Sequence, residues 1–228
     1  MAATNEAARV KQGRTPPETP ATTDPEPSLD LPAGRAVGDL DRSACLALLE
    51  EHGVEVEVLA EVNGVEIPVR LRGPIRGIAV DHRGRSEVHS VLDCRLVLAI
   101  LGWTPHLRQA GVTRLLHYSV YRPNSVVRGT GARSGHASAM AIDVGVVELE
   151  GDRSLEILES WTDRRRDIRA CPPPGGEESE HQALLRGLVC GAVDDELFQI
   201  VLTPHHDDRH RNHLHLEVRP GVDWSLVD

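Results

Sequence analysis

Two segments late in the chain alternate between apolar and polar side chains, which is the pattern of half-buried β-strands. In residues 139–147 the apolar face carries methionine, isoleucine and valine, and Asp143 lies on the opposite face between small residues. In residues 213–218 leucine and valine line one face, while His213 and His215 line the other. Two such strands side by side form a sheet with one buried face and one face of potential ligands. We therefore predict an α+β protein with an antiparallel sheet and flanking helices.

The rest of the chain supplies helices and a hairpin around this sheet. Helical periodicity predicts the helices, and β-like runs on either side of an Asn-Gly turn predict the hairpin. The predicted helices cover residues 41–52, 93–101 and 180–190, and the hairpin joins 54–58 to 65–71 through Asn63-Gly64.

One domain follows an N-terminal tail. Residues 1–37 are Pro-rich and nearly lack large apolar side chains, so we predict that they are disordered. Residues 38–228 hold the apolar side chains of a single core. Hydrophobic residues make up 40% of the chain and aromatic residues only 3%, so this core must consist of leucine, valine, isoleucine and alanine.

The formal net charge of −10 and the scarcity of aromatic side chains disfavour a nucleic-acid partner, because the chain is poor in both phosphate-neutralising and base-stacking groups. No apolar run approaches the length of a transmembrane helix. The start of the chain has no apolar segment of the signal-peptide kind. Two explanations stay open, an export signal outside this sequence or a cytoplasmic location. We expect a monomer.

Four widely spaced cysteines include no Cys-x-x-Cys pair, which argues against a zinc ribbon or a thioredoxin-like redox motif. An even number fits two disulfides in an oxidising compartment, and four buried thiols in a cytosolic protein are the alternative. Four cysteines permit three pairings. We expect pairs within each half of the domain, namely Cys45–Cys94 and Cys171–Cys190.

Residues on and just before the two alternating strands form a candidate metal centre. Two histidines, one carboxylate and an open position are a usual arrangement for a catalytic zinc ion. His136 precedes the first strand, Asp143 lies within it, and His215 lies on the other strand. His213 shares a face with His215, so one of the two can ligate while the other lies close enough to handle a proton at the metal. We predict a Zn²⁺ site with His136, Asp143 and one histidine of this pair as ligands, and the resemblance described next implies that this histidine is His215.

The order of these residues resembles a known signature. The blocks Ser134-x-His136…Asp143 and His210-x-x-His213-x-His215 are similar to those of the LAS metallopeptidases, the lysostaphin, D-alanyl-D-alanine peptidase and hedgehog group. A closer resemblance is to the bacterial extensin-like C-terminal domain family, over most of residues 39–220. It is also carried by Cys45, Pro74-Ile-Arg-Gly77, Leu92-Asp-Cys-Arg95, Tyr121-Arg122-Pro123, Trp161, Cys190 and Val201-Leu-Thr-Pro204.

The resemblance implies a hedgehog- and D-Ala-D-Ala-peptidase-like zinc fold in a periplasmic or extracellular enzyme. Its activity would be hydrolysis of D,D- or related peptide bonds in peptidoglycan stem or cross-link peptides. His213 would act as general base, with His210 as the second candidate. Arg122 would bind a substrate carboxylate or stabilise the oxyanion, and Ser134 and Tyr121 would contact the substrate.

The sequence departs from the family pattern at several positions. The dipeptidase branch of the group places a glutamate where this chain has Asn212, so the general base must lie elsewhere. Ala139 stands where many of these peptidases carry glycine. Tyr121 and Glu217 stand where extensin-like domains often carry cysteine and aspartate.

Each assigned role has a plainer alternative. His213 would support the metal ligands, Arg122 would form a surface ion pair, and Ser134 would cap a turn. His205 and His206 are expected to be solvated loop residues. For the whole protein, the alternative is a zinc-containing module that binds the cell wall or another protein without turnover.

Overall fold

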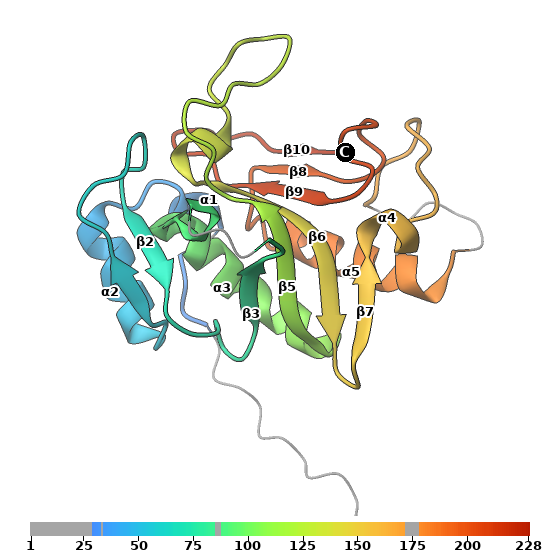
Figure 1. Cartoon of the computed structure of the whole chain (residues 1–228), viewed down its shortest axis with the longest axis horizontal. Helices are drawn as coiled ribbons and strands as arrows, with labels where there is room; N and C mark the ends of the chain where they lie inside the picture. The colour runs from blue at the N-terminus through green and yellow to red at the C-terminus, as the bar shows by residue number, and fades with distance from the viewer. Residues whose placement is uncertain (1–28, 33, 85–87, 172–177) are drawn as a thin grey trace, which may run out of the picture.

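The computed structural model describes residues 29–32, 34–84, 88–171 and 178–228, which form an α+β fold (Figure 1). The strands are β1 (Val56–Val58), β2 (Pro68–Leu71), β3 (Ala79–His82), β4 (Leu92–Asp93), β5 (Val112–Ser119), β6 (Ala141–Leu149), β7 (Arg153–Glu156), β8 (Ile200–Leu202), β9 (Leu214–Glu217) and β10 (Leu226–Val227). The helices are α1 (Gly34–Val37), α2 (Arg42–Glu51), α3 (Cys94–Gln109), α4 (Ile157–Ser160) and α5 (Glu180–Asp194), with single 3₁₀ turns η1 (Val88–Ser90) and η2 (Gly135–Ser138).

The larger sheet has seven strands in the order β10-β8-β9-β6-β5-β3, and β7 also pairs with β6. The central pairs β8–β9, β9–β6 and β6–β5 are antiparallel, as predicted. The prediction of an antiparallel sheet is wrong at its two edges, because β3 runs parallel to β5 and β10 runs parallel to β8. These edge strands are short and carry no sequence pattern that reveals their direction. The sheet is therefore mixed.

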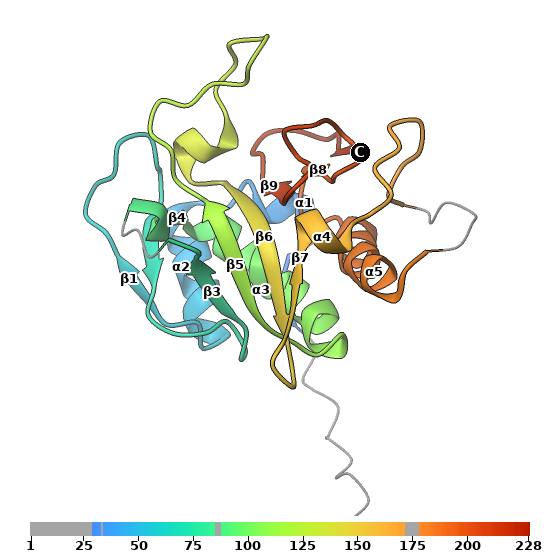
Figure 2. The same ribbon diagram turned by 45° about the vertical axis from the view of Figure 1, so that its right-hand side comes forward.

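Helices cover one face of the larger sheet. Figures 1 and 2 both show α3 behind β3, β5 and β6, opposite the face seen in front. Ile142, Val144 and Leu216 are fully buried in the core, as the alternation of their strands predicts. The intervening Asp143 and His215 are also buried, but they point to the other face, where they contact each other. The strands thus separate a core face from a ligand face.

Strand β5 departs from regular pairing with β6 on both sides of His117. His117 pairs with Val144, and Ser119 pairs with Asp143, although the intervals on the two strands differ by one residue. Such a β-bulge lets consecutive side chains point to the same side. Tyr118 and Ser119 accordingly both lie on the ligand face.

The long helix α3 extends beyond its predicted end. We expected a helix over 93–101, but α3 continues through Pro105 to Gln109. Proline has no backbone N–H, so the Leu101 carbonyl loses its helical partner. The Thr104 hydroxyl donates to that carbonyl at 2.7 Å and replaces the missing bond. The helix is thereby continued at a position where the sequence indicates its end.

The hairpin, the other helices and the disulfides agree with the sequence. Strands β1 and β2 are antiparallel, and the Asn63-Gly64 turn lies inside the bridge between Val62 and Val65. Cys45 is bonded to Cys94 and Cys171 to Cys190, which confirms both predicted pairs. The first pair ties α2 to the start of α3, and the second ties α5 to the end of the segment that follows α4.

The described residues include the last part of the predicted tail. Residues 1–28 of the expected tail lie outside the described residues. Val37, assigned to that tail, ends α1 and is 2% exposed, and Leu29 and Leu31 pack against the core. These three apolar residues of the predicted tail therefore contact the domain. Among the described helices, none is long and apolar enough to cross a membrane.

Candidate metal centre

The three predicted ligands meet at the end of the ligand face. Asp143 on β6 and His215 on β9 are direct cross-strand partners, so their side chains stand beside each other. His136 lies on η2, whose N-terminus is capped by the Ser134 side chain. The turn ends at Ala139, which has a left-handed backbone with φ 55°. This conformation allows the chain to pass from η2 into β6 within two residues.

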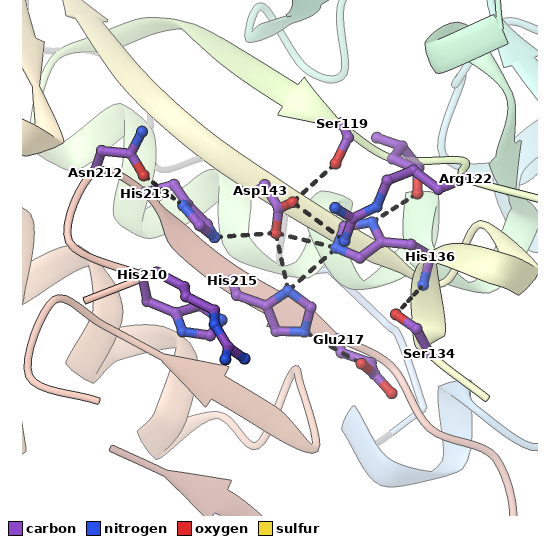
Figure 3. Close-up of polar contacts among 12 residues, drawn as sticks. Ser119, Arg122, Ser134, His136, Asp143, His210, Asn212, His213, His215 and Glu217 are labelled. Carbon is purple, nitrogen blue, oxygen red and sulfur yellow. Dashed lines mark hydrogen bonds and ion pairs between the residues drawn. The ribbon is translucent and has the colours of Figure 1, made fainter. Parts of the chain in front are cut away.

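The ligand atoms lie close together (Figure 3). His136 Nε2 is 3.1 Å from Asp143 Oδ1 and 3.3 Å from His215 Nδ1, and His215 Nδ1 is 2.9 Å from Asp143 Oδ1. Ligands about 2.1 Å from a tetrahedral zinc ion are separated by roughly 3.4 Å. All three side chains are buried, and they form one of two groups among the described residues that have the composition and spacing for a metal ion. The geometry therefore fits a tetrahedral metal site.

Both imidazoles are oriented by hydrogen bonds on their outer nitrogens. The Nδ1–H of His136 donates to the Val120 carbonyl at 2.8 Å, because a carbonyl can only accept. The Nε2–H of His215 donates to the Glu217 carboxylate at 3.2 Å. In the neutral rings this leaves His136 Nε2 and His215 Nδ1 with lone pairs, both directed at the Asp143 carboxylate. Such outer partners are typical of metal-binding histidines.

Glycine makes room for one of these partners. A Cβ atom at position 135 would lie 2.4 Å from the Glu217 carboxyl carbon, so a side chain there would displace Glu217. Arg219 pairs with the other oxygen of Glu217 at 2.7 Å. Gly135, Glu217 and Arg219 thus fix the ring of His215 from behind.

The electrostatics of the group call for a positive charge at its centre. Burial alone would raise the pKa of Asp143, but hydrogen bonds with His136 and His215 hold it well below its usual value. Burial alone would lower the pKa of His215, but its hydrogen bonds with Asp143 and Glu217 raise it to about 9. Without a metal ion, a proton on His215 Nδ1 supplies the charge. A divalent cation can replace that proton, so the residues fit zinc.

Ser119 and Arg122 contact the second oxygen of Asp143. The Ser119 hydroxyl donates to Oδ2 at 2.8 Å, and Arg122 Nη2 lies 3.8 Å from the same oxygen. Arg122 is half-exposed, and its backbone N–H bonds to the His136 carbonyl. Its guanidinium therefore lies at the accessible edge of the centre, as predicted. Sequence reasoning missed Ser119, because the bulge in β5 removes the alternation that would have revealed the strand.

His213 lies beside the three ligands without belonging to their group. Its Nε2 is 3.4 Å from Asp143 Oδ1, and its Nδ1–H donates to the Asn212 side-chain oxygen at 2.9 Å. Burial lowers the pKa of His213 to about 4, although the charge of Asp143 opposes this. The ring is therefore neutral near pH 7 and directs a lone pair toward the centre. The unprotonated Nε2 is positioned to accept a proton at the centre, although the lowered pKa makes it a weaker base than an exposed histidine.

The ring of His210 lies close to those of His213 and His215. Its centroid is 5.1 Å from that of His213, with tilted planes, and 5.9 Å from that of His215, in an edge-on contact. Its Nδ1–H donates to Asp207 at 2.6 Å. Asp207 therefore orients His210. The second group with metal-ligand composition, His206, Asp207 and His210, is only half-buried.

The two residues predicted to contact the substrate beside Arg122 also support backbone near the centre. The Tyr121 side chain is buried, and its hydroxyl donates to the Asn63 carbonyl at 2.7 Å. Ser134 is nearly buried, and its hydroxyl accepts the His136 N–H at 3.4 Å. This is the capping role that was the alternative for Ser134. Both residues hold backbone near the centre.

His205 was expected to be a solvated loop residue, and this expectation is wrong. It is 0% exposed, its Nδ1–H donates to the Arg165 carbonyl at 2.6 Å, and its Nε2 accepts the Trp161 indole N–H at 3.3 Å. It therefore joins the segment after α4 to the loop that leads into β9. The sequence offered one signal, the single tryptophan of this segment, Trp161, because an indole N–H needs an acceptor when it is buried.

Fold and site together define an α+β protein with a buried His/Asp/His group built on two paired strands of a mixed sheet. The chain belongs to the family described as extensin-like protein C-terminus, which matches residues 43–226. This confirms the resemblance to extensin-like domains. No curated protein and no solved structure matches the chain significantly.

Proposed function

We propose that this protein is a periplasmic or extracellular zinc peptidase, related to the LAS metallopeptidases and their hedgehog-like fold. Its substrates would be D,D- or related bonds in peptidoglycan stem or cross-link peptides. The observation that carries the proposal is the convergence of His136 Nε2, Asp143 Oδ1 and His215 Nδ1, with both imidazole lone pairs fixed inward. A buried carboxylate facing two such lone pairs is unfavourable without a cation between them.

The residues around the centre have the chemistry of peptide hydrolysis. Bound zinc would polarise the peptide carbonyl and lower the pKa of water. His213 Nε2 would accept a proton from the attacking water and return it to the departing amine. The Arg122 guanidinium would stabilise the negative charge that develops on the carbonyl oxygen. The Ser119 hydroxyl donates to Asp143 and holds this carboxylate in place as a metal ligand. In the proposed reaction the proton is taken up by His213 and not by Asp143.

The two disulfides support an exported location. Disulfides persist in oxidising compartments and are uncommon in the bacterial cytosol. Both pairs lie within the domain that carries the centre. A wall peptide is the substrate that an exported enzyme of this kind would meet.

The test combines metal analysis with a search for products. Purified protein is incubated with muropeptides before and after chelation, products are identified by mass spectrometry, and bound zinc is measured. We expect one zinc ion per chain, hydrolysis that chelation abolishes, and recovery on adding zinc. His215→Ala should remove zinc and hydrolysis together, while His181→Ala, at an exposed position on α5, should change neither. If zinc binds but no wall peptide is cleaved, the non-catalytic binding module is the better description.

A further inference from the structure

Next to the candidate centre lies a residue that neither the motif nor the proposed chemistry uses, Tyr118. It follows His117 on β5 and points to the ligand face because of the bulge. Its ring covers Gly145, where an added Cβ would lie 2.4 Å from the Tyr118 ring. Gly145 is two residues beyond Asp143 on the same strand, or about 7 Å along it. The phenol ring thus lies beside the centre, over the residue about 7 Å from Asp143 along β6.

The ring of Tyr118 contacts the candidate base. Its centroid is 6.3 Å from that of His213, and the two planes meet at 84°. Tyr118 therefore lies on the His213 side of the centre. Arg122 lies on another side, against Asp143 and His136, as Figure 3 shows. In the proposed reaction His213 protonates the departing amine. The part of the substrate that leaves with this amine would consequently lie against Tyr118.

The hydroxyl of Tyr118 has a proton to give. It accepts a hydrogen bond from Arg83 Nη1 at 3.1 Å, and the same guanidinium pairs with Glu156 through Nη2 at 2.8 Å. Arg83 also lies over the ring, 5.7 Å from its centroid. A phenol that accepts one hydrogen bond can still donate its own O–H. The hydrogen bond that the phenol oxygen accepts from Arg83 also strengthens the Tyr118 O–H as a donor.

We propose that Tyr118, positioned by Arg83, binds a free carboxylate on the leaving-group side of the scissile bond. The substrate class is then a peptide whose terminal residue is removed, so the enzyme acts as a carboxypeptidase on short wall peptides. Tyr118 contacts the substrate, and Arg83, held by its ion pair with Glu156, orients the hydroxyl. This inference rests on the proposed function for the reaction, but the carboxylate-binding subsite is a property of Tyr118 and Arg83 alone.

The test compares two peptides that differ only at the C-terminus, one with a free carboxylate and one with a carboxamide. For the unmodified enzyme, kcat/KM should favour the carboxylate by about 10-fold or more, the worth of one hydrogen bond to a charged group. Tyr118→Phe keeps the ring that packs on His213 and removes only the hydroxyl. It should bring the ratio close to 1, mostly by lowering the rate for the carboxylate peptide. Arg83→Gln should lower the ratio in the same way.

Arg114→Gln is the matched control. Arg114 lies on β5, toward the end of the strand opposite to Tyr118. Its side chain is 46% exposed against 43% for Arg83, and it pairs with Glu148 as Arg83 pairs with Glu156. The control should keep the preference for the carboxylate. A preference that survives in Tyr118→Phe, or its absence in the unmodified enzyme, would overturn the proposal.

A second measurement separates this inference from the proposed function. N-acetyl-D-alanine and its amide are titrated into the protein while the Tyr118 ring signals are followed by NMR. Binding of the acid but not the amide, with shifted Tyr118 signals, supports the subsite even if no peptide is hydrolysed, in which case only the proposed enzyme activity fails. Hydrolysis without discrimination between the two termini overturns the subsite and leaves the peptidase standing. If the protein neither binds the acid nor hydrolyses any peptide, both the subsite and the peptidase are overturned.

Discussion

Two buried aspartates, Asp93 in the three-stranded sheet β1-β2-β4 and Asp143 in the larger sheet, have different kinds of partner. Asp93 ends β4 and is 0% exposed, and its oxygens accept hydrogen bonds from the Ile67 N–H and from Arg95 at 2.8–3.1 Å. Asp143 is 5% exposed, and its Oδ1 faces His136 Nε2 and His215 Nδ1. The first carboxylate is paired with a permanent cation, whereas the positive charge beside the second is either a proton on His215 or a metal ion.

The difference separates a structural carboxylate from a ligand. Arg95 is permanently charged and only 3% exposed, so the pair Asp93–Arg95 is complete when the chain has folded. The imidazoles at Asp143 can hold either a proton or a metal ion in the same place. We expect substitutions at the first aspartate to change stability, and those around the second to change metal binding and activity.

The largest expected effect is on the catalytic side of this comparison. His213→Ala should lower the rate of peptide hydrolysis by about 10²–10⁴-fold, the usual worth of a general base. It should retain most of the zinc, because its imidazole lies outside the ligand group. Steady-state kinetics and metal analysis of the same sample check both statements. If His213→Ala loses zinc and His215→Ala retains it, the roles within this pair are reversed.

The next effect is on stability. Asp93→Asn should lower the free energy of unfolding by about 3 kcal/mol, because it removes the buried partner of Arg95 and leaves this arginine with only the exposed carboxylate of Glu66, 3.0 Å away. Asp143→Asn, measured on metal-free protein, should lose less than half as much, since His215 can release its proton when the carboxylate is gone. Urea denaturation of both variants is the measurement. Equal losses would mean that the two aspartates do not differ as described.

A smaller effect is expected behind His215. Glu217→Gln should weaken zinc binding by about 10–100-fold, because a neutral amide fixes the imidazole less firmly than a carboxylate does. Competition with a chromogenic chelator measures the affinity. Glu178→Gln provides a control, since it changes a carboxylate that pairs with Arg186 away from the centre. Unchanged zinc affinity in Glu217→Gln would show that the Nε2 hydrogen bond does not orient the ligand.

The smallest expected effect is at the turn that carries His136. Ala139 has φ 55°, a conformation that is unfavourable for any residue with a Cβ. Ala139→Gly should stabilise the protein by about 1 kcal/mol or less, because the relief of strain is partly offset by the greater freedom of glycine in the unfolded chain. Thermal unfolding checks the sign. A destabilised variant would indicate that the buried methyl group contributes more through packing than its backbone costs.

The strands that carry the centre could be predicted because each obeys a strict alternation. Residues 139–147 and 213–218 separate core from ligand side chains, and the structure places Asp143 and His215 as cross-strand partners. The same reasoning could not find β5, because irregular pairing around His117 interrupts the period of two. Ser119 and Tyr118 were missed for this reason. The bulge that brings both to the ligand face also hides them from a pattern search.

Other differences arise from contacts that are distant in sequence. The continuation of α3 depends on one hydroxyl replacing the hydrogen bond that Pro105 removes. The buried state of His205 depends on Trp161, more than forty residues away in the chain. The hydroxyl of Tyr121 donates to the carbonyl of Asn63, which is 58 positions away in the chain. Local pattern cannot reveal such partners.

The pairing of Asp143 with His215 has a consequence for how this protein can change over evolutionary time. The two residues are separated by 72 positions in the chain, yet their spacing is set by direct pairing across two adjacent strands, β6 and β9. Insertions or deletions in the intervening connections alter the rim of the site without moving the two ligands. The length and composition of these connections are therefore free to diverge. New substrate preferences can arise in this way while the two ligand residues stay in place.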